Sequence, residues 1–203
     1  MTTIVRKLAF LTATLAGLAS AAAQAAPAGE PDPARRVGLE GGVGLYGGEI
    51  NCEDDVANRC DGVTEAGGLA GHLTYMFGPK LGITFDVWPM IHREDNFTLT
   101  HTVVTLGATL RPVPILGLTV GLGGANAVAR WDNVLGGIDV ENRNEAGGAI
   151  LFAADIDIVR GRNFAVALGA RAGIAFYGED SDDDGNPDIV ARNLGLGASI
   201  TWF

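Results

Sequence analysis

The residues whose spacing most clearly suggests chemistry are acidic side chains near the end of the chain. The stretch DSDDDGNPD places Asp180, Asp182 and Asp184 on alternate positions, follows them with Gly185, and adds Asp188 four residues after Asp184. Carboxylates on alternate residues of a tight loop can converge on one hard cation, and glycine permits the sharp turn. The spacing therefore predicts a Ca²⁺ site formed by Asp180, Asp182, Asp184 and Asp188.

This acidic stretch resembles the EF-hand loop and the Asp-rich calcium repeat of thrombospondin type 3. It departs from the EF-hand pattern at Ala191, where an EF-hand carries its bidentate glutamate. The other interpretation is a solvated acidic loop rich in turn residues. Because the chain has no cluster of cysteines and histidines, we expect no zinc site and no cofactor besides this Ca²⁺.

The N-terminus has the layout of an export signal. A basic start, MTTIVRK, precedes the apolar run LAFLTATLAGLA and the small residues AAAQAA. This pattern predicts a secretory signal peptide over 1–25, which is too short for a spanning helix. Residues 26–35 are Pro-rich and are expected to form a periplasmic linker, which leaves 36–203 as one domain. In an exported chain, Cys52 and Cys60 predict a disulfide rather than a redox-active CxxC pair.

Other chemistry has little support in the sequence. The formal net charge of -10 argues against a nucleic-acid partner, because phosphate binding requires a basic surface. A lipid hydrolase or acyltransferase needs a serine near a histidine and a carboxylate. Outside the signal peptide the serines are Ser181 and Ser199, and neither neighbours His72, His92 or His101 in sequence. We therefore expect a protein that is not an enzyme.

The elements that must position these residues are strands. Apolar residues alternate with small or polar ones over eight stretches, as in ILGLTVGLGG, where Leu116, Leu118, Val120 and Leu122 share one face. The connections after the second, fourth and sixth stretches are tight (GPK, RPVP and RGR). The connections after the first, third, fifth and seventh stretches are expected to be long and polar, over about 47–66, 89–98, 132–145 and 178–188.

The two faces of these strands indicate what surrounds them. One face is nearly pure Leu, Val, Ile and Phe, and the other is mostly Gly, Ala, Thr and Ser with a few charges. An eight-stranded barrel has an interior just wide enough for side chains, so the small polar face suits the lumen and the large apolar face suits lipid. The pattern predicts an all-β, eight-stranded, antiparallel up-and-down transmembrane β-barrel.

Charged residues on the small face are expected inside the barrel. There they must pair with one another or contact water, either as a structural plug or, alternatively, along an ion path. These lumen charges are Glu40, Asp86, Asp155, Asp157 and Arg171. Aromatic residues are expected in two interfacial girdles. The periplasmic girdle would contain Phe77, Phe164, Trp202 and Phe203, and the outer girdle Tyr46, Trp88, Trp131, Phe176 and Tyr177.

The alternating strands, the asymmetric connections and the closing stretch NLGLGASITWF resemble the small outer-membrane barrels of the OmpA, OmpX and OmpW type. The resemblance covers about Arg36 to Phe203. It implies that barrel assembly machinery reads the last strand, with Phe203 as the signal. Such tails often carry an aromatic residue two positions earlier, where this chain has Thr201. We expect a monomer in the outer membrane of a Gram-negative bacterium, in contact with lipid and lipopolysaccharide.

Function is predicted less closely than fold. Most of the 24 acidic residues fall in the expected long connections. They could keep exposed loops soluble, or form a cation-collecting rim beside anionic lipopolysaccharide. We expect a non-enzymatic surface protein whose acidic extracellular loops serve adhesion, ion binding or envelope integrity. The alternative is a narrow channel for cations or small solutes.

Calorimetry tests the predicted calcium site. We expect one saturable Ca²⁺ site that persists at higher salt and is lost in the variant Asp182→Asn/Asp184→Asn, because ligand charge determines affinity. An acidic surface without a site would instead give unsaturable heats that salt suppresses in both proteins.

Overall fold

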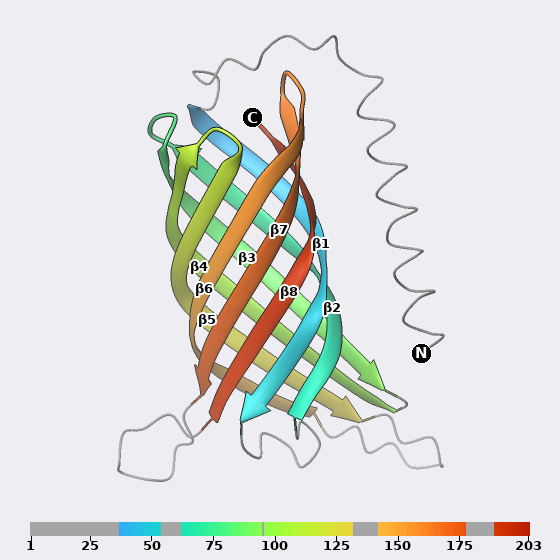
Figure 1. The fold of residues 1–203 in the computed structure, drawn as a ribbon. Helices are drawn as coiled ribbons and strands as arrows, with labels where there is room; N and C mark the ends of the chain where they lie inside the picture. Colours follow the sequence, from blue (N-terminus) through green and yellow to red (C-terminus); the bar gives the residue numbers. More distant parts are fainter. Residues whose placement is uncertain (1–36, 54–61, 95, 132–141, 178–188) are drawn as a thin grey trace, which may run out of the picture.

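A computed structural model describes residues 37–53, 62–94, 96–131, 142–177 and 189–203 (Figure 1). Within these residues eight strands form one closed barrel, as predicted. The strands are β1 (Gly38–Glu53), β2 (Gly62–Met76), β3 (Leu81–Glu94), β4 (Phe97–Val113), β5 (Leu116–Trp131), β6 (Asn142–Arg160), β7 (Phe164–Tyr177) and β8 (Ile189–Trp202). No helix in this part of the chain is long and apolar enough to cross a membrane.

Every strand pairs antiparallel with its sequence neighbours, and β1 also pairs with β8 to close the barrel. The closing register runs from Gly41 opposite Trp202 to Glu53 opposite Val190. Strong coiling brings neighbouring backbones close together, and glycine permits this approach. At Gly107, for example, a Cβ would collide with the β5 backbone.

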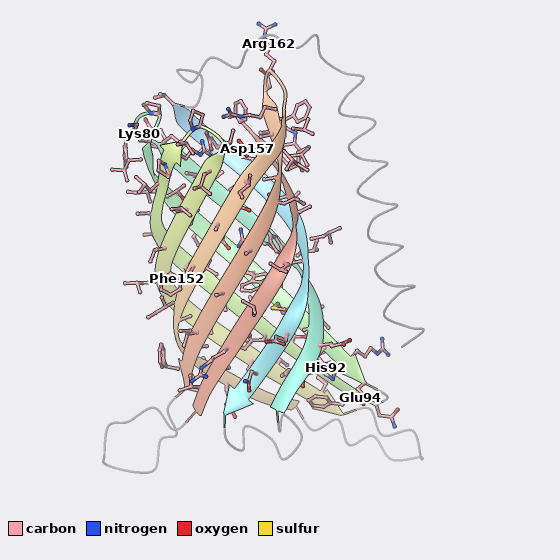
Figure 2. The ribbon with its side chains drawn as sticks, viewed as in Figure 1. Lys80, His92, Glu94, Phe152, Asp157 and Arg162 are labelled. Atoms are coloured by element: carbon pink, nitrogen blue, oxygen red, sulfur yellow. The ribbon has the colours of Figure 1, made fainter. Side chains whose placement is uncertain are left out.

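The alternation of side chains places apolar residues outside, because successive side chains of a strand point to opposite faces. On the outer face, Leu122 and Leu196 are 65% and 67% exposed, whereas Thr105 and Asp86 on the inner face are each 2% exposed. Large apolar side chains cover the outer face of all eight strands (Figure 2). This arrangement is the reverse of a water-soluble barrel and suits a lipid environment.

The tight connections lie at one end of the barrel, and the other end carries the strand ends that lead to the undescribed connections (Figure 1). The predicted long connection over 89–98 is wrong, because β3 continues to Glu94 and β4 begins at Phe97. Proline lacks an N–H for the ladder and is uncommon inside a sheet. Pro89 nevertheless stays within β3 opposite Thr102, and the alternation of inner and outer residues continues past it.

The other long connections are also revised at their edges. β1 ends at Glu53 and β2 begins at Gly62, so the first connection is shorter than predicted. β6 begins at Asn142, so the third connection is also shorter. The fourth agrees, because β7 ends at Tyr177 and β8 begins at Ile189. The expected signal peptide (1–25) and linker (26–35) lie outside the described residues and stay predictions.

A pair of substitutions on β5 tests which face meets lipid. Val120 and Val128 both point outward and lie about 20 Å apart along the barrel axis. We expect Val120→Arg to cost about 2–4 kcal/mol of unfolding free energy if Val120 lies at the bilayer midplane, and Val128→Arg, near the interface, about 0–1 kcal/mol. Urea unfolding in lipid vesicles measures both, and equal costs would contradict this depth assignment.

Candidate functional site

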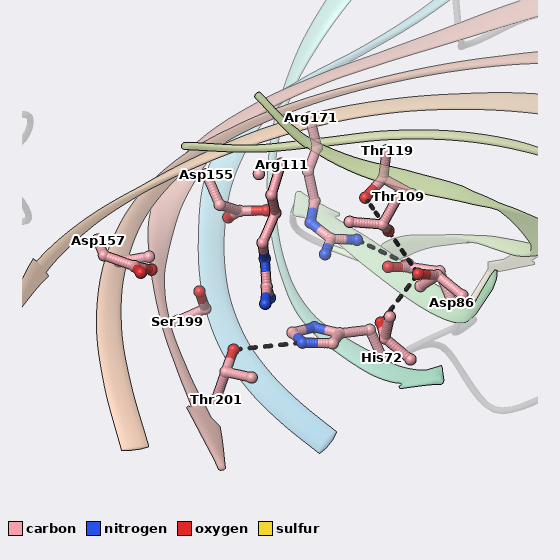
Figure 3. A pocket seen from close by; sticks show the side chains of 14 residues that line it. His72, Asp86, Thr109, Arg111, Thr119, Asp155, Asp157, Arg171, Ser199 and Thr201 are labelled. Carbon is pink, nitrogen blue, oxygen red and sulfur yellow. Dashed lines mark hydrogen bonds and ion pairs between the residues drawn. The ribbon is translucent and has the colours of Figure 1, made fainter. Parts of the chain in front are cut away.

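The barrel lumen contains a polar region near the end with the tight connections. A cavity of about 40 Å³ lies there, large enough for a few water molecules. Four of the predicted lumen charges line this cavity, and Figure 3 shows them pointing inward: Asp86 from β3, Asp155 and Asp157 from β6, and Arg171 from β7. The fifth, Glu40, is 1% exposed beside it.

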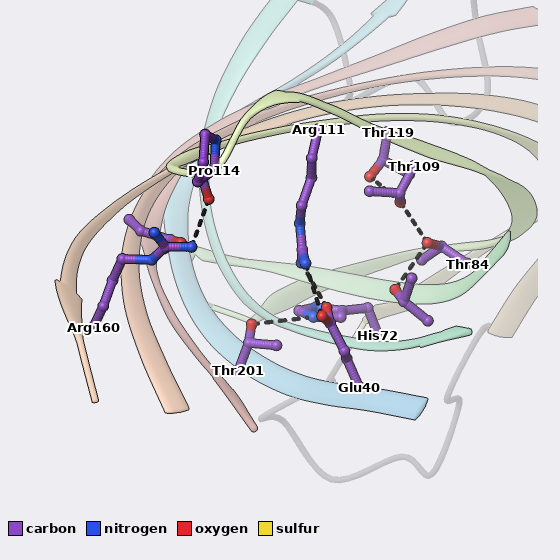
Figure 4. A network of polar contacts seen from close by, with 11 residues as sticks. Glu40, His72, Thr84, Thr109, Arg111, Pro114, Thr119, Arg160 and Thr201 are labelled. Atoms are coloured by element: carbon purple, nitrogen blue, oxygen red, sulfur yellow. Dashed lines mark hydrogen bonds and ion pairs between the residues drawn. The ribbon is translucent and has the colours of Figure 1, made fainter. Parts of the chain in front are cut away.

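Glu40 forms an ion pair that crosses the lumen. Arg111 on β4 donates from Nη1 and Nη2 to the two carboxylate oxygens of Glu40 on β1, at 2.7 and 2.5 Å. Figure 4 shows the Arg111 side chain extending across the barrel to reach it. Two parallel hydrogen bonds between a guanidinium and a carboxylate fix direction as well as distance. The pair therefore holds two opposite walls of the barrel together.

A second buried ion pair also spans the lumen. Arg171 on β7 donates from Nη1 to Asp86 Oδ1 on β3 at 2.6 Å, and both side chains are almost fully buried. The guanidinium of Arg171 lies 4.8 Å from the ring centroid of Tyr46, within the range of a cation–π contact. The Tyr46 hydroxyl donates to Asp155 Oδ1 at 3.3 Å. These contacts connect four strands around one buried charge.

Threonines line one side of the cavity. Hydroxyl contacts join Thr74, Thr84, Thr109 and Thr119 on the consecutive strands β2 to β5, at 2.8, 2.5 and 2.7 Å (Figure 4). Because each hydroxyl can donate once and accept twice, such a row satisfies itself without a charge. The row gives this wall of the cavity a polar surface.

The rim near the tight connections contains a third ion pair. Asp157 and Arg160 on β6 approach to 3.2 Å, and Arg160 also donates to the Pro114 carbonyl at 2.7 Å. Nearby, His72 Nε2 contacts the Thr201 hydroxyl at 3.2 Å. Ser199 lines the same cavity, and the described hydrogen-bond contact of His72 is with Thr201.

The other half of the lumen is filled by apolar side chains, which we call the apolar plug. Its larger members are Tyr46, Ile50, Trp88, Met90, Leu99, Val103, Leu151 and Tyr177. Trp88, Met90, Val103 and Leu151 have no exposed surface at all. Alanines on the surrounding strands complete the cluster and leave room for these larger groups. Close packing of this kind excludes water from the section of the lumen that it fills.

A set of polar contacts is embedded in the apolar plug. His101 on β4 contacts the Tyr177 hydroxyl through Nε2 and the Asn193 amide through Nδ1, each at 2.6 Å. Both ring nitrogens are therefore partnered, as a buried imidazole requires. The three residues come from β4, β7 and β8, so this contact also crosses the lumen.

The predicted outer aromatic girdle is wrong for three residues. Tyr46, Trp88 and Tyr177 are 3%, 0% and 2% exposed and belong to the apolar plug. Their positions are out of phase with the outward residues of their own strands, so the period-two pattern itself indicated the lumen. In the predicted periplasmic girdle, Phe77 and Trp202 are exposed as expected.

Sequence reasoning missed several lumen residues. Arg111 belongs to the expected tight connection RPVP, but it has the same phase as Thr105 and Thr109 and lies in β4. His101 was considered only as a catalytic candidate, although its phase on β4 places it inward. For Arg111 and His101 alike, the period-two phase on β4 indicates an inward side chain. Which residues they contact across the lumen depends on how the barrel closes.

Several predicted site residues cannot be placed. Asp180, Asp182, Asp184, Asp188 and Cys60 lie outside the described residues, so the calcium site and the disulfide stay predictions. Cys52 is described only as a backbone position in β1, opposite Gly62. Within the described ranges no group of three His, Cys, Asp or Glu residues could hold a metal ion. The Phe203 amide donates to the Asn163 carbonyl at 3.1 Å, beside the connection between β6 and β7.

The fold is shared with solved bacterial outer-membrane proteins. The attachment invasion locus protein Ail of Yersinia pestis matches with a TM-score of 0.56 and 15% identity, over 82% of this chain and 100% of that chain. The Neisserial surface protein NspA matches with a TM-score of 0.50 and 13% identity, over 80% of this chain and 96% of that chain. This chain has the fold of the small eight-stranded outer-membrane barrels. At such identities the likeness concerns the fold alone. No protein-family model and no curated protein matches the sequence.

The Arg171–Asp86 pair supports a prediction about barrel stability. Arg171→Met leaves the buried Asp86 carboxylate without its cation and should cost about 3–5 kcal/mol of unfolding free energy. The double variant Arg171→Met/Asp86→Leu removes both charges and should recover part of that loss. Urea unfolding of the single variants Arg171→Met and Asp86→Leu and of the double variant measures the coupling. A double variant with the sum of the two single losses would contradict a direct interaction.

Proposed function

We propose that this chain is a non-enzymatic barrel of the outer membrane of a Gram-negative bacterium, which anchors acidic loops at the cell surface and does not conduct solutes. The single observation that carries the proposal is the filled lumen. The apolar plug closes one half, and side-chain contacts from opposite walls cross the rest. A conducting barrel keeps a continuous polar interior instead.

The outer face supports a membrane location. On β4 the outward side chains are apolar from Val104 to Val113. Ten residues at the usual tilt rise about 25 Å along the barrel axis, which matches the apolar band of outer-membrane barrels. In such barrels the short turns face the periplasm and the longer connections face outside. This orientation puts the undescribed connections that carry most of the acids at the cell surface.

The named neighbours agree with a surface role. The matched Yersinia pestis protein is named for attachment and invasion, and the Neisserial protein is named as a surface protein. By that analogy we propose adhesion, ion binding or envelope integrity as the role of the acidic loops. A monomeric state, insertion by the barrel assembly machinery, the Ca²⁺ site and the Cys52–Cys60 disulfide are parts of the same proposal.

A narrow channel is the second candidate. The observation in its favour is the polar cavity beside Asp155 and Arg171, which would provide half of an ion path. The apolar plug is the obstacle, because an ion that crossed it would lose its hydration without compensating contacts.

Planar-bilayer recordings separate the two candidates. We expect no single-channel conductance from the refolded chain, and measurable conductance from the variant Trp88→Ala/Leu151→Ala/Tyr177→Ala, which removes the large side chains of the apolar plug. The variant shows that an opened barrel would be detected under the same conditions. Steady, cation-selective steps from the unmodified protein would replace the anchor proposal with the channel.

A further inference from the structure

We infer that Asn96 is the acceptor of an N-linked oligosaccharide, which the chain receives in the periplasm and displays at the outer tip of the barrel. The acceptor motif for this modification is Asn-x-Ser/Thr, in which x is any residue except proline. Among the ten asparagines of the chain, the single match is Asn96-Phe97-Thr98. The inference adds a modification to the proposed function and rests on its orientation in the outer membrane.

The motif begins in the short hairpin that joins β3 to β4. Glu94 pairs with Phe97 at the end of the ladder, so Asn96 belongs to the turn, and its side chain is exposed. Asparagine is favoured in turns because its side chain can bond nearby backbone groups. This hairpin lies at the end of the barrel with the undescribed connections, where Figure 2 shows Glu94 projecting beside His92. An exposed turn of an exported chain is the setting that the motif requires.

The height of the turn leaves room for a sugar chain. The apolar surface of β4 ends at Val104, and Asn96 lies eight residues before it. At the usual rise and tilt this places Asn96 about 20 Å beyond the apolar band. The headgroup region of a bilayer is only about 5–8 Å thick on each side. An oligosaccharide on Asn96 would therefore stand clear of the lipid headgroups.

The hairpin is held in place without the Asn96 side chain. The ring of Phe97 is partly buried, packs against the apolar plug, and lies 6.2 Å from the ring of His92. Phe97 thus anchors the tip from the inside, while Asn96 remains exposed. An oligosaccharide on Asn96 would leave this packing unchanged.

The strand ladder indicates when the transfer occurs. Thr98 pairs with Arg93 on β3 and with Arg130 on β5, so its backbone is held on both sides once the barrel has closed. A transferase that binds the Asn96 amide and the Thr98 hydroxyl together can reach them in the unfolded exported chain. After insertion the tip faces away from the periplasm. The transfer therefore precedes closure of the barrel.

The donor for this reaction is an oligosaccharide linked to a polyprenyl diphosphate. Asn96 Nδ2 attacks C1 of the first sugar, so that a C1–N bond forms and the C1–O bond to the diphosphate breaks. The nitrogen loses one proton, polyprenyl diphosphate leaves, and nothing is oxidised or reduced. The Thr98 hydroxyl supplies a hydrogen bond to the transferase. Glu94, two residues before Asn96 and 78% exposed, offers a carboxylate to a cationic group of the same enzyme.

The opposite end of the barrel provides an internal control. Asn163 lies in the exposed turn between β6 and β7, and Phe164 follows it as Phe97 follows Asn96. The third residue there is Ala165 instead of a threonine. Asn163 therefore shares the exposure and the neighbour of Asn96 but lacks the hydroxyl, and it should stay unmodified.

Peptide mass spectrometry of the chain purified from the outer membrane of its own bacterium tests the inference. Trypsin releases Asn96 in the peptide 94–130, because the bond between Arg111 and Pro112 resists cleavage, and Asn163 in the peptide 163–171. We expect the peptide 94–130 to carry an added mass equal to a series of sugar residues. The peptide 163–171 should have the mass of its sequence alone. A peptide 94–130 without added mass would overturn the inference.

Variants identify the atom that carries the sugar. Asn96→Gln and Thr98→Val should each abolish the added mass, and Thr98→Ser should retain it because serine keeps the hydroxyl. Glu94→Gln should lower the modified fraction, and an equal fraction would remove the role given to Glu94. Added mass that persists in Asn96→Gln would place the sugar on a hydroxyl and overturn the N-linked assignment.

A folding control separates this inference from the proposed function. Heat-modifiable gel migration of the outer-membrane fraction shows whether the wild-type chain and each variant form the barrel. If the wild-type chain is absent from that fraction, the outer-membrane proposal fails and the inference fails with it. If the wild-type chain is present as a folded barrel and Asn96 is unmodified, only the acceptor assignment is wrong.

Discussion

The narrow interior of an eight-stranded barrel decides most of what this molecule can do. Eight strands enclose a space only wide enough for side chains, so every inward residue must pack against, or hydrogen-bond to, residues from the opposite wall. The chain meets this constraint in two ways. Paired charges and hydroxyls fill the half near the tight connections, and the apolar plug fills the other half. The outer face is left with the large apolar side chains, which require lipid.

The polar contacts join opposite walls of the barrel. Glu40 with Arg111 and Arg171 with Asp86 each connect strands on opposite sides of the lumen. Buried ion pairs contribute little net stability compared with apolar packing, but removing one partner is costly. Their effect is to favour one closure of the sheet over others. We therefore propose that a barrel fixed in this way is a rigid support for surface-exposed segments and offers no continuous route through its centre.

The sequence predicted the fold well because period-two alternation is local. Val120 and Thr119 were assigned to their correct faces from their neighbours alone, and the inward placement of Glu40 and Asp86 followed in the same way. The sequence does not predict the partners of these charges. Arg111 and Glu40 are 71 residues apart in sequence, and the tilt and stagger of the strands bring them together. The error at Trp88 has another cause. The preference of aromatic residues for membrane interfaces conflicts there with the phase of the strand, which points Trp88 inward.

The central claim is a barrel with lipid outside and a dry plug inside, and NMR of the refolded chain in lipid nanodiscs tests it most directly. Magnetisation transfer from lipid acyl chains should reach the outward side chains of Leu118, Val120 and Leu122. The indole proton of Trp88 should show transfer from Val103 and none from water. Water contact at Trp88, with lipid contact at the inward threonines, would contradict the account.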